Sequence, residues 1–122
     1  MTGGWIAAGA LLCAASIAAG AFGAHGLRSR LDAEALALWE TSARYLMYGG
    51  LGVLLIALAA RPVGGWLYAW AAASLLVGSI VFSGTVAILA LGGPRFLGAI
   101  TPIGGLLMIV AFAILCVAAL RG

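Results

Sequence analysis

The sequence predicts an all-α membrane protein, an antiparallel bundle of four transmembrane helices with an amphipathic interfacial helix between the first two. Two observations predict this fold. Hydrophobic residues make up 66% of the 122 residues and charged residues only 7%, and the mean hydropathy of +1.25 is typical of a chain solvated by lipid. In addition, four apolar runs are each close to the ~20 residues that cross a bilayer as a helix.

The four predicted spans cover residues 5–23, 43–60, 66–91 and 102–120 of a single domain, 1–122. The first run ends in small residues suited to cleavage, but MTGGW before it has no Lys or Arg, which secretory signals normally carry. We therefore interpret it as a retained first helix. Short connections between the runs make sequential helices antiparallel.

Proline and glycine define most of the helix ends. Pro62 with Gly64 and Gly65 ends the second span, and the segment GGPRF ends the third, because proline cannot continue a helix and glycine favours turns. At the start of the fourth span, Thr101 is predicted as N-cap and Pro102 as the first helical residue.

The long connection after the first span is predicted to form an amphipathic helix over residues 30–42. Leu31, Ala35, Leu38 and Trp39 recur at helical spacing, so one apolar stripe faces the membrane surface. Trp39 is expected at headgroup depth. The chain is then expected to turn into the second span at about Thr41 to Arg44.

The net charge of +3 indicates orientation in the membrane and not nucleic-acid binding. Arg28, Arg30, Arg44 and Arg95 fall at one end of the spans, whereas Arg61 and Arg121 fall at the other. By the positive-inside rule, the end that carries His25 is cytoplasmic and both termini are outside.

Small residues at four-residue spacing predict close helix packing. The first span carries Ser16, Gly20 and Ala24, and the third carries Ser79, Ser83 and Ala87. A flexible hinge at Gly49, Gly50 and Gly52 stays open as an alternative role for the glycines of the second span. The further glycines assigned to packing are Gly78, Gly84, Gly104 and Gly105.

Two cysteines lie in separate apolar runs. We interpret Cys13 and Cys116 as small buried side chains, with a disulfide or redox pair as the alternative.

Drawn antiparallel, the spans gather most polar side chains at one end, which makes that end the candidate site. A structural role is the alternative for each of them: a histidine can stabilise a helix C-terminus, tyrosines anchor at the interface, and serine and threonine hydroxyls bond backbone carbonyls. The gathered residues are His25, Glu40, Arg44, Tyr45, Tyr48, Ser83, Thr85 and Thr101.

No pattern of residues predicts catalysis, a metal or a cofactor. One histidine and two distant cysteines do not provide a metal-ligand set, and no paired carboxylates or phosphate-binding loop occur in the sequence. Asp32, Glu34 and Glu40 all lie outside the spans, so no carboxylate is placed at mid-membrane for proton-coupled transport.

Four segments closely resemble the domain-of-unknown-function 423 family, also called transmembrane-protein-256-like proteins. They are AFGAHGL (21–27), WETSARY (39–45), FSGT (82–85) and ITPIGG (100–105). The resemblance implies a small four-helix, multi-pass protein of the bacterial plasma membrane, with relatives in mitochondria and no established activity. The family's polar positions fall on His25, Thr41, Tyr45, Ser83 and Thr101.

The chain departs from the family pattern at three positions. Leu46 and Gly49 replace the usual glutamine and second histidine, and Ala87 replaces a frequent tyrosine. A mechanism that requires two imidazoles is therefore doubtful for this protein.

The leading interpretation is a non-enzymatic accessory or scaffold protein of the bacterial inner membrane, which packs in the lipid bilayer against itself or a larger membrane complex. The alternative is a transporter or binding protein for a small or lipidic ligand that uses the polar face around His25. A membrane enzyme with His25 as its base is a third, weaker hypothesis.

Overall fold

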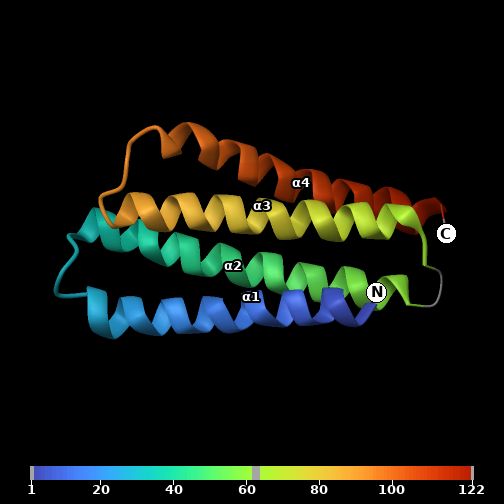
Figure 1. Ribbon diagram of the computed structural model, residues 1–122, viewed down its shortest axis with the longest axis horizontal. Helices are drawn as coiled ribbons and strands as arrows, with labels where there is room; N and C mark the ends of the chain where they lie inside the picture. The colour runs from blue at the N-terminus through green and yellow to red at the C-terminus, as the bar shows by residue number, and fades with distance from the viewer. Residues whose placement is uncertain (1, 62–63, 122) are drawn as a thin grey trace.

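A computed structural model describes residues 2–61 and 64–121, and the described chain forms four long helices (Figure 1). Helix α1 (Thr2–Phe22) continues into a short π-helical segment, η1 (Gly23–Leu27), and is followed by α2 (Ala33–Ala60), α3 (Trp66–Ala90) and α4 (Leu97–Arg121). All four are long and apolar enough to cross a membrane. The predicted all-α class with four helices of spanning length is therefore confirmed.

The helices pack in chain order, so that α2 and α3 are central and α1 and α4 are the outer helices (Figure 1). On α1 and α2, Gly9 faces Gly50 and Ser16 bonds Ala43; residue numbers rise on one helix as they fall on the other. Figure 1 shows the same alternation of direction along the whole chain. The four helices thus form a row in which α1 and α4 lie on opposite sides.

Glycines allow the central helix α2 to approach both of its neighbours. A Cβ on Gly50 would lie 2.8 Å from the Cys13 backbone nitrogen on α1, and a Cβ on Gly49 would overlap the side chain of Ser79 on α3. A Cβ on Gly52 would likewise overlap the side chain of Leu75 on α3. These glycines lie in an uninterrupted helix, so their observed role is close packing and the structure shows no hinge at them.

Only part of the predicted small-residue surface lies between helices. Ser16 is buried against α2, and Gly78 and Gly104 bring α3 and α4 together, since a Cβ on Gly78 would lie 2.8 Å from the Gly104 carbonyl oxygen. Gly105 has ordinary room, with Phe82 3.6 Å from its Cβ position.

Three of the predicted packing residues, Gly20, Ala24 and Gly84, lie away from helix contacts. Gly20 and Ala24 are exposed, and a Cβ on Gly20 or Gly84 would meet nothing within 4 Å. Steps of four residues rotate by about 40° each around a helix. A contact face therefore alternates steps of three and four, and on α1 it follows Gly9, Ser16 and Gly23.

The sequence predicted a separate interfacial helix over 30–42 and a turn at Thr41 to Arg44. This prediction is wrong, because α2 runs without interruption from Ala33 to Ala60. Its N-cap is Asp32, whose side chain accepts a hydrogen bond from the Ala35 backbone N–H at 2.8 Å. No glycine or proline lies between Ala33 and Tyr48 to break the helix. The first turns of α2 therefore continue the span.

The predicted start of the fourth helix is also wrong. Helix α4 begins at Leu97, and Pro102 lies inside it, so Thr101 is not an N-cap. The first turn forms because backbone N–H groups of residues 97–99 donate to carbonyls three positions earlier, beginning with Leu97 to Pro94 at 3.2 Å. Pro102 has no N–H group, so the hydrogen bond to the Gly98 carbonyl is missing from this helix.

Glycine is required in the connection between α2 and α3. Gly64 and Gly65 have φ values of +64° and +117°, which other residues rarely adopt. Pro62, which we predicted to end the second helix, lies outside the described residues. Cys13 and Cys116 are free thiols on the two outer helices, half-buried and exposed respectively, so the structure does not pair them.

Candidate functional site

The four motif segments meet in pairs between successive helices. At the first contact, the Trp39 indole N–H of α2 donates to the Ala19 carbonyl of α1 at 2.8 Å. The indole lies edge-on to Phe22 with ring centroids 6.1 Å apart, and a Cβ on Gly23 would be 2.6 Å from its Cδ1 atom. Gly23 therefore makes room for this tryptophan.

The second contact joins α2 to α3. The buried Ser42 hydroxyl donates to the Ser83 carbonyl at 2.8 Å, and the Tyr45 ring packs against Phe82 with centroids 4.5 Å apart. The Ser83 hydroxyl has no hydrogen-bond partner among the described residues, although the side chain is only 2% exposed. A buried hydroxyl without a partner costs free energy.

The third contact joins α3 to α4 through two threonines. The Thr85 and Thr101 hydroxyl oxygens are 2.6 Å apart. Thr85 also lies 2.8 Å from the Val81 carbonyl, and Thr101 lies 3.0 Å from the Leu97 carbonyl. Because each hydroxyl has one proton, one threonine donates to the other, which then donates to the carbonyl one turn earlier on its own helix.

His25 does not join these contacts. It lies in η1, is exposed, and makes no side-chain hydrogen bond within the described chain. The π-helical turn follows Ala19, whose carbonyl accepts the Trp39 N–H, and side-chain insertion of this kind is a known cause of helix irregularity. The imidazole therefore lies at the end of the outer helix, apart from Tyr45, Ser83 and Thr101.

The two remaining candidate residues lie at the same end of α2. The Thr41 hydroxyl donates to the Ala37 carbonyl at 3.0 Å, and an Arg44 guanidinium N–H lies 3.4 Å from the Thr41 oxygen. Arg44 is exposed. These contacts are local to one helix.

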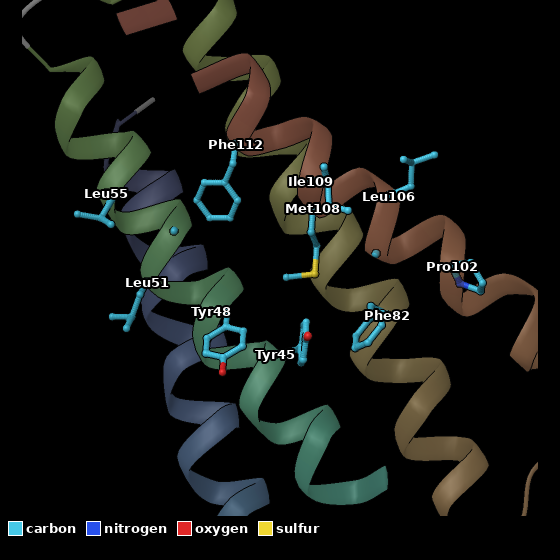
Figure 2. Close-up of a pocket in the computed structure, with 12 residues that line it drawn as sticks. Tyr45, Tyr48, Leu51, Leu55, Phe82, Pro102, Leu106, Met108, Ile109 and Phe112 are labelled. Atoms are coloured by element: carbon cyan, nitrogen blue, oxygen red, sulfur yellow. The ribbon is translucent and has the colours of Figure 1, made fainter. Parts of the chain in front are cut away.

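A groove that the sequence did not predict separates α2 from α4, with α3 as its floor (Figure 2). Its volume is about 830 Å³, within the ~300–1,000 Å³ typical of ligand sites. Figure 2 shows Tyr48, Tyr45 and Phe82 across one end and Phe112 toward the other, with Met108 between them. Tyr45 and Tyr48 are thus the residues of the predicted polar end that line the groove.

The polar side chains and the groove differ in what they contact. Ser42, Thr85 and Thr101 use their hydroxyls to tie helices together. Among residues 2–61 and 64–121, no group of three or more His, Cys, Asp or Glu side chains could hold a metal ion. The groove, by contrast, is a preformed and mostly apolar volume.

Comparison with known proteins identifies relatives over nearly the whole chain. Residues 19–105 match the family described as "Protein of unknown function (DUF423)". The UPF0382 membrane protein SERP0230 of Staphylococcus epidermidis is 42% identical over 96% of this chain and 95% of its own length. The UPF0382 membrane protein YwdK of Bacillus subtilis is 36% identical over 96% of both chains. No solved structure matches the chain significantly.

Proposed function

The chain belongs to the DUF423 family of proteins of unknown function, and on that premise we propose that it is a small non-enzymatic accessory protein. It packs in the bacterial inner membrane against a second copy of itself or a larger membrane complex. The observation that carries this proposal is the outer face of α1, which consists mainly of small side chains and is exposed. In lipid, small residues favour helix association because they let backbones approach closely.

We call this surface the α1 ridge. Its residues recur at steps of three and four, so they lie in one row along the helix. The exposed His25 follows one turn after the last of them and provides a polar group at the end of the row. The ridge consists of Gly4, Ala7, Leu11, Ala14, Ala18 and Ala21, all exposed.

The orientation follows the arginines. All six are exposed, four at the His25 end and two at the opposite end, and by the positive-inside rule this excess favours a cytoplasmic His25 end. A reporter fused to the C-terminus tests this orientation: we expect activity only from a reporter that works outside the cytoplasm. Activity of a cytoplasmic reporter instead would reverse the assignment.

Cysteine cross-linking in isolated membranes tests the accessory role. In a Cys13→Ser, Cys116→Ser background, Ala14→Cys and Ala18→Cys on the α1 ridge are expected to form a cross-linked species on mild oxidation. Val110→Cys, at an exposed position on α4, is the matched control and is expected to stay monomeric. The mass of the product distinguishes a second copy from another protein.

The proposal fails if the α1 ridge and the α4 control cross-link equally, or if neither does. A second pair of variants removes dependence on cysteine chemistry. Ala14→Leu with Ala18→Leu should dissociate the complex in mild detergent without changing the melting temperature of the subunit, because both side chains point outward.

A second candidate function is the binding of a lipidic ligand. The groove between α2 and α4 favours it, although the site then differs from the polar face around His25 that the sequence suggested. The α1 ridge and this groove lie on different helices, so the two functions are compatible.

A further inference from the structure

We infer that the groove between α2 and α4 holds one acyl chain of an anionic phospholipid, whose headgroup lies beside Arg44. This inference names a ligand for the second candidate function. It does not depend on the α1 ridge, which is formed by a different helix.

The groove lies between two walls that each pack closely against α3. Gly49 and Gly52 bring α2 against α3, and Gly78 with Gly104 brings α4 against α3. On the α4 wall, Gly105 contributes no side chain to fill the space. The close contacts at the floor thus leave a hollow above it.

The length of the groove matches one leaflet. Along α2 it extends from Tyr45 to Leu55, and along α4 from Pro102 to Phe112, which is a rise of about 15 Å on each helix. The hydrocarbon core of a bilayer is about 30 Å thick. A transmembrane helix of a second copy would need a groove through the whole core, whereas a single acyl chain needs only half of it.

The chemistry of the lining also fits a lipid chain. Of its twelve residues only the two tyrosines carry a hydroxyl group, and the rest are aliphatic, aromatic, methionine, glycine or proline. Leu55 and Ile109 on the two walls are 62% and 68% exposed. The groove is therefore open to the side, where lipid chains are the solvent.

Both hydroxyls lie toward the cationic end. Arg44 is one helical turn before Tyr48 and on the same face of α2, and it is 17 residues from Arg61 at the other end of the span. This separation is about 25 Å along the helix, so Arg44 lies near one membrane surface. Its contact with Thr41 uses one of the five N–H donors of the guanidinium, and the others can bind a phosphate oxygen.

Native mass spectrometry of the full chain in mild detergent tests the inference, with equimolar phosphatidylglycerol and phosphatidylcholine as probes. The wild-type protein should retain phosphatidylglycerol in preference. Gly105→Leu, which fills the groove, should lower total retained lipid about tenfold. The matched control is Gly84→Leu, where an added Cβ meets nothing within 4 Å, and it should retain lipid as the wild type does.

A second pair of variants tests the headgroup. Arg44→Gln should lower the preference for phosphatidylglycerol about fivefold, because one arginine near an anionic lipid surface strengthens binding by about this factor. Arg28→Gln removes an exposed arginine from the same end of the molecule and should leave the preference unchanged. Equal effects of the two substitutions would overturn the assignment to Arg44.

Three further results would overturn the inference. The first is that Gly105→Leu retains as much lipid as the wild type. The second is that the wild type retains the two lipids equally. The third is that Gly105→Leu loses a dimer instead of a lipid. Should Gly105→Leu lower the melting temperature, Ile109→Trp obstructs the groove from an exposed position and repeats the test.

Discussion

The two outer helices, α1 and α4, are both apolar and of spanning length, yet they present different surfaces to the membrane. The exposed face of α1 is mostly alanine and glycine. That of α4 carries large side chains such as Ile103, Ile109 and Leu120. Large aliphatic groups pack well with lipid chains, whereas small ones suit another helix. Hydropathy alone therefore does not distinguish a helix that faces lipid from one that faces protein.

The inner faces of the same two helices are alike. Gly9 of α1 faces Gly50 of α2, and Gly104 of α4 faces Gly78 of α3, with added Cβ atoms 2.8 to 2.9 Å from the opposing carbonyl oxygen. Each outer helix also makes a hydrogen bond to its neighbour near the His25 end. The comparison therefore predicts that substitutions on the inner faces of α1 and α4 have equal effects, whereas substitutions on their outer faces have unequal effects.

The largest effect is expected from enlarging the inner glycines. Gly50→Leu and Gly104→Leu should each lower the free energy of unfolding in mixed micelles by about 3 kcal/mol or more, because the opposing backbone cannot move away. Gly84→Leu, in open space, is the control. If only one of the two inner variants unfolds, the inner faces are not equivalent.

The next effect concerns the threonine pair that joins α3 to α4. A double-mutant cycle of Thr85→Val and Thr101→Val should give a coupling energy between about 0.6 and about 1.7 kcal/mol, the average and the maximum for hydrogen bonds between membrane helices. Unfolding of the four proteins in mixed micelles measures it. Strictly additive single effects would show that the 2.6 Å contact contributes nothing.

A similar but smaller effect is expected where α1 meets α2. Trp39→Phe keeps most of the ring packing and removes the N–H that bonds Ala19, so it should cost about 0.5 to 1.5 kcal/mol. Trp39→Leu is the companion variant, which also removes the edge contact with Phe22 and should cost more. Equal losses in the two variants would mean that the hydrogen bond, and not the aromatic contact, stabilises this end.

The smallest effect on stability is expected on the outer surface of α1. His25→Ala should leave the melting temperature unchanged, because the imidazole is exposed and makes no hydrogen bond in the described chain. The same variant should weaken cross-linking through Ala18→Cys if His25 extends the α1 ridge. A loss of stability would instead assign His25 a role in holding η1.

The sequence predicted the helices well because length, hydropathy and glycine or proline positions determine them. It did not predict where α2 and α4 begin. A polar stretch such as 33–42 can continue a helix when nothing breaks it, and Pro102 is tolerated because it lies near the start of α4. Local composition does not decide either outcome.

The candidate site was predicted only in part. The sequence placed Thr85 and Thr101 at the same end, and the structure brings them into contact. The groove was not predictable, because it depends on the separation of α2 and α4, which are not consecutive. His25 lies in the π-helical turn η1, and the local sequence, which continues the apolar run of α1, does not indicate this turn.

Packing in chain order has a consequence for biogenesis. Each helix contacts chiefly the one made just before it, so the ribosome can release α1 and α2 as a finished hairpin while α4 is still unsynthesised. Folding from such near-neighbour contacts is fast. The protein can therefore assemble stepwise during insertion, and its last step, the arrival of α4, is the one that completes the groove.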